Sequence, residues 1–430
     1  MRSGSPRNRR RIGALTLAAT IAAVPTALPA WQIAGPADAS PGERRIAAAL
    51  HAIETRPSDA QPRIDLAWAY TKRAREVSDP SFYDRATEAA AKALELEAGN
   101  LDARKAQVWA LLGRHEFGRA REEAAKLHAI VKDDVMVYGF LADAHAELGN
   151  YKEAEEAVQW MLDMRPSNLS GLTRAAYLRE VFGDVEGAIE AYGTAVARLS
   201  PVEIEDRAWM LSQIGHLLLS IGKETEASTV LQQAFDAFPR YHYALGTMGK
   251  VRLAQRKPAE AVALYRQLYE MAPHAENLYL LAEALDAAKS PEAARTFVEF
   301  ERQALAESTQ RDNANRELVF YYVDHARKPA EAVRIAAIER AHRGDVFTLD
   351  AHAWALSAAG RHAEARREID RALAVGIRDA TMLYHAGTIA SRQGDRQAAR
   401  THLEASLAVN PRSPVAERVR AEVARLSRAS

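Results

Sequence analysis

Small residues recur along this chain at a fixed interval, and this recurrence is the feature that most restricts its fold. Gly149 returns as Gly183, and Ala154 returns as Ala188, each 34 positions later. The same interval separates further pairs of small or rigid residues, namely Gly360 and Gly394, Pro239 and Pro273, Ala227 and Ala261, and Ala365 and Ala399. A constant period in this range indicates a stack of helical repeats rather than two or three unrelated compact domains.

One unit of the repeat can be followed between Tyr138 and Pro166. A first helix is predicted from apolar or small residues on one stripe, at Tyr138, Leu141, Ala142 and His145. Gly149 breaks that helix, and a second helix carries its inner stripe at Ala154, Val158 and Met161. Pro166 then ends the second helix. Two antiparallel helices approach closely only where side chains are short, so we expect the recurring alanines to be contact points between helices.

This pattern resembles the tetratricopeptide repeat. The clearest copies carry Leu141-Ala142, Gly149, Tyr151, Ala154 and Pro166; Ile214-Gly215, Gly222, Ala227, Leu231, Ala234 and Pro239; Met248-Gly249, Ala261, Tyr265 and Pro273; and Ala386-Gly387, Gly394, Ala399, Leu403 and Pro411. The resemblance implies an all-α protein, a right-handed α-solenoid of stacked antiparallel helix pairs. It covers residues 61–412 as about ten units. The frame is least regular in 289–332, where Lys289 and Arg327 occupy the place of the turn glycine.

Single helices are expected to close both ends of the array. Residues 40–60 read as a half unit whose helix, Ser40 to Glu54, places Ile46, Leu50 and Ile53 on one stripe. Residues 413–430 read as a capping helix that starts at Ser413-Pro414 and faces the array with Val415, Val419, Val423 and Leu426. Polar outer faces at the ends keep an open solenoid soluble.

The first 39 residues have the layout of a secretory signal peptide. Five arginines up to Arg11 precede an apolar run from Ile12 to Val24, and Ala37-Asp38-Ala39 is a small-x-small cleavage site before Ser40. The prediction is therefore export, to the periplasm or the medium, with no membrane insertion after cleavage. The alternative is an anchor formed by an uncleaved N-terminal helix, which Pro25 and Pro29 would interrupt.

Composition and motifs argue against several classes of function. The chain has no cysteine, which excludes disulfides, thiolate metal sites and cysteine nucleophiles. Without residues 1–39, 52 of the 57 basic and 56 of the 57 acidic residues remain, a formal charge of −4, so nucleic acid is an unsuitable partner. No metalloprotease, serine hydrolase, phosphate-loop or dinucleotide motif occurs. We expect no enzyme activity, no cofactor and no metal site.

The resemblance places ligands on the concave side of the array, which the first helices of the units line. Aligning the units by their alanines puts a recurring set of mostly aromatic side chains there: Trp68, Tyr177, Trp209, His216, Tyr243, Lys250, Tyr279, Glu283, Tyr321, Phe347, Trp354 and Tyr384. We expect these residues to form a ladder that grips a peptide, as aromatic residues do at interfaces. The alternative for each ring is packing between neighbouring helices.

The sequence thus predicts an exported, non-enzymatic scaffold that binds a protein or peptide along its groove, in envelope assembly or secretion. A second interpretation keeps the fold but makes the ligand a glycan of an export system, because exposed Trp and Tyr also stack on sugars. A third interpretation is an enzyme, either a helical one of unrecognised type or the regulatory subunit of one.

Overall fold

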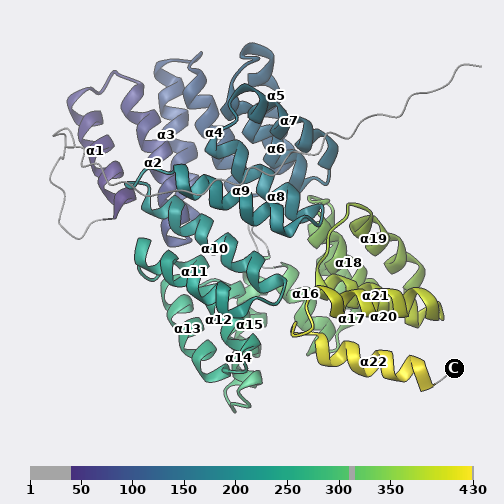
Figure 1. Cartoon of the computed structure of the whole chain (residues 1–430). Helices are drawn as coiled ribbons and strands as arrows, with labels where there is room; N and C mark the ends of the chain where they lie inside the picture. The colour runs from purple at the N-terminus through teal and green to yellow at the C-terminus, as the bar shows by residue number, and fades with distance from the viewer. Residues whose placement is uncertain (1–39, 309–314, 429–430) are drawn as a thin grey trace, which may run out of the picture. The chain divides into compact units, whose positions relative to one another are not determined.

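The computed structural model describes residues 40–308 and 315–428, which belong to one compact unit, Ala39–Ser430. Every regular element in these residues is a helix, and they contain no strand. The predicted signal peptide, residues 1–39, lies outside the described residues. The fold is the expected α-solenoid, with consecutive helices packed side by side in chain order (Figure 1).

The helices have the following bounds: α1 Pro41–Thr55, α2 Gln61–Val77, α3 Ser81–Leu96, α4 Leu101–Gly113, α5 Phe117–Ile130, α6 Val135–Glu147, α7 Tyr151–Met164, α8 Leu169–Val181, α9 Val185–Arg198, α10 Ile204–Ser220, α11 Glu224–Ala237, α12 His242–Ala254, α13 Pro258–Met271, α14 Ala275–Ala287, α15 Ala293–Glu307, α16 Asn315–Asp324, α17 Pro329–Arg340, α18 Val346–Ala358, α19 His362–Ala374, α20 Ala380–Arg392, α21 Arg396–Val409 and α22 Ala416–Arg428.

Helices α2 to α21 form helix-turn-helix pairs, from α2–α3 to α20–α21, between the single helices α1 and α22. A residue with left-handed backbone conformation stands in the turn of each pair: Ser78, His115, Gly149, Gly183, Gly222, Arg256, Lys289, Arg327, Gly360 and Gly394. Lys289 and Arg327 adopt φ values of 55° and 54°. They therefore occupy the turn position itself, in a conformation that glycine adopts with less strain.

The recurring alanines lie where helices touch, as the sequence predicts. Ala154, Ala188, Ala227 and Ala261 are all fully buried. Glycines of the first helices make room in the same way, because a Cβ on Gly215 would overlap the side chain of Leu231 on the second helix of the pair. Short side chains thus set the close approach within each pair.

Helix α1 begins as predicted, with Ser40 as its N-cap in a capping box with Glu43. Its inner face differs from the expectation in one residue. Ile46 and Ile53 pack against the core, but Leu50 is 44% exposed and the neighbouring Ala49 is buried instead.

Helix α22 begins at Ala416 rather than at Ser413-Pro414. The segment before it is a turn because Asn410 and Arg412 hydrogen-bond to the distant carbonyl oxygens of Leu219 and Gly222, at 3.0 Å and 2.7 Å. The predicted inner stripe is nevertheless correct. It consists of Val415, Val419 and Leu426, which are buried, and Val423, which packs against them.

The array curves until its early units touch units 130 to 196 positions further along the chain. We call this line of contacts the seam. In its middle, the turns at Gly149 and Gly183 meet the backbone of Gly344 and Gly376, and Gly222 meets the side chain of Asn410. An apolar core from helices α6 to α8 and α18 to α20 crosses the seam at this point.

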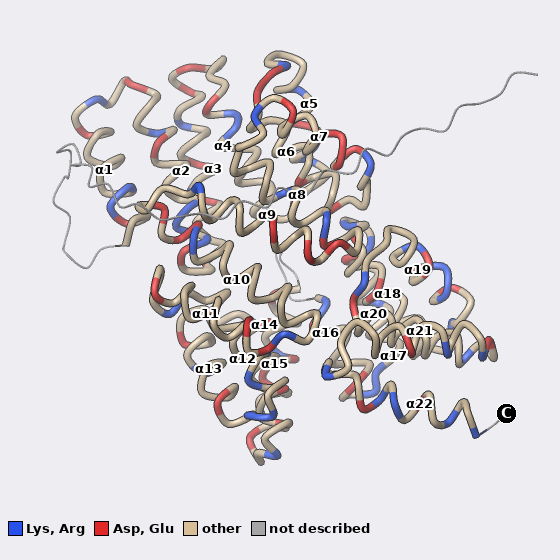
Figure 2. Tube along the Cα trace, in the orientation of Figure 1, with Lys and Arg blue, Asp and Glu red and all other residues tan. Residues whose placement is uncertain are grey.

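Near the N-terminal helices, the seam is polar. Lys72 on α2 pairs with Asp206 at the start of α10, at 2.5 Å. Arg75 of α2 reaches Glu205 and Asp206, at 3.1 Å and 3.3 Å. Charged residues of both signs are interspersed along the described helices (Figure 2). The charges at the seam are therefore largely matched in pairs.

Candidate functional site

Two of the residues expected to line the binding face belong to the core instead. Tyr321 is 8% exposed and stacks on Phe297, with ring centroids 5.4 Å apart. Trp354 is 3% exposed and stacks on His385 at 4.2 Å. These two rings therefore pack between neighbouring helices, which is the alternative given above for each ring, and they are not exposed on a binding face.

Most of the other predicted residues are half-buried and already have contacts within the protein. They are Trp68, Tyr177, Trp209, His216, Tyr279, Glu283, Phe347 and Tyr384. Trp209, for example, packs edge-on against Tyr192, and Arg75 lies over its ring at 5.4 Å. The polar members are engaged as well, since His216 contacts Glu180 at 3.2 Å and Glu283 contacts His325 at 2.5 Å.

Tyr243 and Lys250 are the two predicted residues that are exposed, and both line a cleft of about 1070 Å³. The cleft lies at the seam. One wall comes from the turn between α2 and α3 and from the end of α4, and the other from α12 and α14. The curvature of the array thus brings the ends of early helices over the inner face of later ones.

The α12 wall presents one face of that helix to the cleft. Tyr243, Thr247 and Lys250 line it at i, i+4 and i+7, the spacing of a single helical stripe. Gly246 lies between them, and a Cβ there would meet only Leu268, at 3.7 Å. Neither the Thr247 hydroxyl nor the Lys250 ammonium has a hydrogen bond or ion pair with any residue that the structure describes. This stripe is therefore available to a ligand.

Two histidines hold the cleft walls together. His242, the first residue of α12, contacts the carbonyl oxygen of Arg75 through Nε2 at 2.6 Å, and His274 contacts the carbonyl oxygen of Ser78 in the same way. Because a carbonyl oxygen only accepts, each Nε2 carries the proton and donates it. Burial lowers the pKa of His242 to about 4, and the Arg75 guanidinium acts in the same direction. His242 is therefore neutral at pH 7.

The charge of Arg75 stays within the protein. Burial opposes this charge, but the carboxylates of Glu205 and Asp206 outweigh that effect and raise the pKa of the guanidinium. Tyr241 also donates to Glu205, at 2.5 Å. Arg75 thus holds α2 against α10. Its charge is already compensated by Glu205 and Asp206, so it does not attract a ligand.

Glu276 on α14 is the acidic counterpart of Lys250 in the cleft. Its side chain lies on the open surface of the cleft, but the walls around it remove part of its hydration. This desolvation first, and the nearby carboxylate of Glu317 second, raise its pKa. Lys250, Arg316 and His274 oppose this rise. No described residue donates a hydrogen bond to Glu276 or pairs with it. Its negative charge is therefore incompletely compensated.

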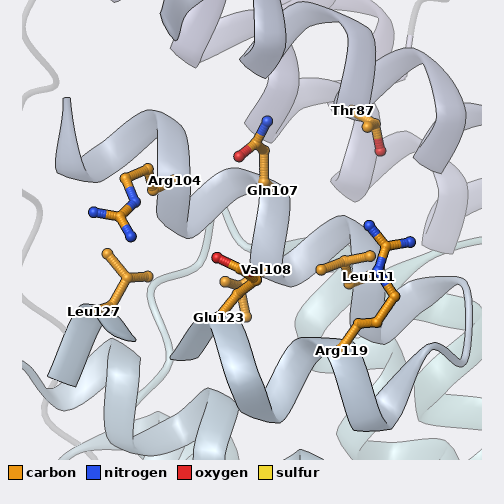
Figure 3. Close-up of a pocket in the computed structure, with 8 residues that line it drawn as sticks. All are labelled: Thr87, Arg104, Gln107, Val108, Leu111, Arg119, Glu123 and Leu127. Carbon is orange, nitrogen blue, oxygen red and sulfur yellow. The ribbon is translucent and has the colours of Figure 1, made fainter. Parts of the chain in front are cut away.

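A smaller hollow of about 260 Å³ lies between α3, α4 and α5 (Figure 3). Val108, Leu111 and Leu127 supply its apolar side chains. Several of its polar groups are already used within the chain: Thr87 donates to the Tyr83 carbonyl at 2.9 Å, Arg119 pairs with Glu116, and Glu123 pairs with Lys126 at 2.7 Å. The cleft at the seam is therefore the better candidate for a binding site.

Within residues 40–308 and 315–428, no group of three or more His, Asp or Glu residues is arranged to hold a metal ion. No helix among the same residues has both the length and the apolar character needed to cross a membrane.

Sequence reasoning missed Arg75, His242, His274 and Glu276. The two histidines had a usable signal, because each lies at the start of a unit, directly after Tyr241 or Pro273. Arg75 had none, since its contacts with Glu205 and Asp206 join distant units. Glu276 lies three positions before the predicted Tyr279 on α14, so the helical period could have indicated it.

The fold and the cleft define a helical-repeat scaffold, and the comparisons with known proteins agree on the repeat. The model of the tetratricopeptide repeat family matches residues 141–204, 247–304 and 351–414. Tetratricopeptide repeats are therefore present in these three stretches. No curated protein matches the sequence.

Solved structures with similar architecture have low sequence identity to this chain. The human IFIT1 dimer with PPP-AAAA is 12% identical, covers 86% of this chain and 94% of its own, and has a TM-score of 0.48. Yeast Tom70 is 12% identical, with coverage of 90% and 92% and a TM-score of 0.40. PilW, described as a widely conserved type IV pilus biogenesis factor, is 13% identical, with coverage of 48% and 92% and a TM-score of 0.40. The likeness is one of helical repeat architecture.

Proposed function

We propose that this protein is an exported, non-enzymatic scaffold that binds a peptide segment of a partner protein in the cleft at the seam. The observation that carries the proposal is the α12 stripe of Tyr243, Thr247 and Lys250. It combines an exposed ring with the Thr247 hydroxyl and the Lys250 ammonium, which have no partner among the described residues, on a rigid helix facing a cavity. Such a surface costs little ordering entropy when a partner binds.

The organisation of the chain supports a scaffold. The described residues are distributed among helix pairs, two capping helices and the connections between them, so catalytic groups would have to lie on the repeats themselves. The charged groups around the cleft are mostly joined in ion pairs, and the histidines at its wall bond to backbone carbonyl oxygens. That arrangement suits binding better than proton transfer.

Export is supported by the fit between the predicted cleavage site and the first helix. Ser40, the expected first residue after cleavage, is the N-cap of α1, and its hydroxyl contacts Glu76 at 2.8 Å. Its backbone nitrogen donates to Glu43 at 2.8 Å. Cleavage before Ser40 would leave the cap side chain in place and put a new ammonium group beside these carboxylates, whose charge would offset the unfavourable helix dipole at this end of α1.

Capture of partners from a cell-envelope extract tests the binding site. Wild-type protein is expected to retain a discrete partner, and the variant Tyr243→Ala with Lys250→Ala is expected to lose it without a change in melting temperature. Val298→Ala is the matched control, because Val298 is 64% exposed on α15. Equal capture by all three proteins would place the binding site elsewhere.

Export has a separate test, mass spectrometry of the protein recovered from periplasm and medium. The expected N-terminus is Ser40. Recovery of the full-length chain in the membrane fraction would support the uncleaved anchor, and its retention in the cytoplasm would overturn the export proposal. Either result would leave the scaffold proposal standing.

A further inference from the structure

We propose that the cleft recognises a short extended peptide that carries one acidic and one basic side chain, the acidic group binding Lys250 and the basic group binding Glu276. This inference rests on the proposed function and specifies the chemistry of the partner. It follows from which charges of the cleft are already matched within the protein and which are not.

The basic residues that line the cleft are matched, apart from Lys250. Arg75 is held by Glu205 and Asp206. Arg114 pairs with Asp84 at 2.7 Å, and Arg119 pairs with Glu116. Lys250 has no carboxylate within ion-pair distance among the described residues. A carboxylate on the ligand would therefore gain an ionic hydrogen bond without displacing an internal partner.

The acidic residues that line the cleft show the same contrast. Asp84 is paired with Arg114, and Asp79 accepts from the backbone nitrogen of Ser81 at 2.9 Å. Glu307 accepts from Gln303 at 2.8 Å and from the backbone nitrogen of Ala275. Glu276 accepts no hydrogen bond from the described residues, and the neighbouring carboxylate of Glu317 repels it. A cation bound there would relieve that repulsion.

Lys250 and Glu276 attract each other but do not form an ion pair. They are held apart on separate helices, α12 and α14. One ligand that offers both charges can therefore satisfy both residues at once, whereas a ligand of one sign is attracted by one and repelled by the other. Tyr243 adds a ring that is 44% exposed, on which an apolar part of the peptide can pack.

The size of the cleft favours a peptide over a small molecule. Its volume of about 1070 Å³ slightly exceeds the usual range of small-molecule pockets, roughly 300–1,000 Å³. Its walls are also rich in polar and charged side chains, whereas small-molecule pockets are mostly apolar. An extended backbone with polar side chains matches such walls.

The test uses the purified full chain and four pools of short synthetic peptides. Each pool contains a fluorescent label and randomised uncharged positions, together with an acidic and a basic residue, an acidic residue alone, a basic residue alone, or no charged residue. Fluorescence anisotropy measures binding. Wild-type protein is expected to bind the mixed pool about tenfold more tightly than either pool of one sign.

Charge reversals make the test specific. Lys250→Glu gives the cleft two unmatched acids and is expected to shift the preference to the basic pool. Glu276→Lys gives two unmatched bases and is expected to shift it to the acidic pool. The control substitutions Lys132→Glu and Asp286→Lys reverse exposed charges outside the cleft and are expected to keep the wild-type order.

Equal binding of all pools, an unchanged order in the reversal variants, or no binding up to about 1 mM would overturn this inference. Loss of partner capture with Tyr243→Ala and Lys250→Ala would still support the scaffold in that case, so the two proposals fail separately.

Discussion

The backbone of Gly149 lies directly against the backbone of Gly344. A Cβ atom on Gly149 would overlap the carbonyl oxygen of Gly344, and a Cβ on Gly344 would overlap the carbonyl oxygen of Leu148. The Gly344 nitrogen donates to the Glu147 carbonyl at 3.0 Å. Distant parts of the array thus meet here without any side chain between them, which makes this point of the seam highly sensitive to added volume.

Gly149→Ala is therefore expected to destabilise the protein more than the same change at an equivalent turn. Gly360 is the matched control, because its φ of 77° is nearly that of Gly149, 78°, and a Cβ added to Gly360 would have no other atom within 4 Å. The left-handed conformation alone costs alanine about 1–2 kcal/mol. Gly149→Ala should cost about 1–3 kcal/mol more, from the overlap with the seam.

Urea unfolding of both variants measures the difference. Equal losses of unfolding free energy at positions 149 and 360 would show that the seam is open in solution.

Much of the fold follows from the repeat in the sequence. The period predicted the buried alanines correctly, since the burial of Ala154 and Ala188 depends only on contacts with neighbouring helices. It also placed Lys289 and Arg327 at turn positions, where both adopt left-handed conformations. A one-dimensional array is predictable in this way because each unit contacts mainly its neighbours.

The seam and the cleft were not predictable by the same reasoning. The contact of His242 with Arg75 joins residues 167 positions apart, and it depends on the summed curvature of several units. The hydrogen bond of Asn410 to the Leu219 carbonyl oxygen joins residues 191 positions apart in the same way. The burial of Tyr321 and Trp354 was missed for a related reason, because adjacent helices cover rings that a single-unit alignment leaves open.

The neutral state of His242 predicts a dependence of stability on pH. Its pKa falls from 6.5 to about 4 on folding because burial disfavours the charged ring. The unfolded chain therefore binds the proton first, so this contribution to stability is complete above pH 6.5 and is lost as pH falls toward 4. Between pH 7 and pH 5, the loss should be about 2 kcal/mol.

The variant His242→Gln isolates this effect, because glutamine supplies an N–H donor but does not titrate in this range. Its unfolding free energy should fall less than that of the wild type between pH 7 and pH 5. Parallel profiles for the two proteins would contradict the assignment to His242.

Alanine substitutions at Trp209 and Tyr243 should distinguish a residue that stabilises the fold from a residue that binds the partner. Trp209 packs against Tyr192 and beneath Arg75, so Trp209→Ala is expected to lower the unfolding free energy by about 2–3 kcal/mol. Tyr243→Ala removes an exposed ring and should change it by less than about 0.5 kcal/mol. Chemical denaturation of the two variants, beside the capture of partners, checks this division. A large loss of stability with Tyr243→Ala would make that ring structural.

The close packing of helix pairs predicts a penalty for added volume at the alanine contacts. Ala154 on α7 is fully buried, so Ala154→Leu should cost about 1–3 kcal/mol. Ala125 on α5 is exposed, and Ala125→Leu is the control with the same change of side chain and little expected effect. Thermal melting of the two variants measures the contrast. Similar melting temperatures would mean that α7 has room that the structure does not show.

Ion pairs across the seam should differ in strength according to burial. Arg343 pairs with Glu147 and also contacts Asp345 at 3.3 Å, and burial raises the pKa of Glu147 in spite of this partner. Arg343→Met leaves these carboxylates unmatched and should cost about 2–4 kcal/mol of unfolding free energy. Adding Glu147→Gln should recover part of the loss, because one unmatched charge disappears.

The exposed pair of Arg256 and Glu417 is the control for this comparison. It spans the array at 3.1 Å, but its side chains are 86% and 81% exposed, so water and salt screen the attraction. Arg256→Ala should leave the unfolding free energy unchanged within error, at both low and high salt. If Arg343→Met is equally neutral, the partly buried ion pair does not hold the seam, and the apolar core between α6 to α8 and α18 to α20 must hold it instead.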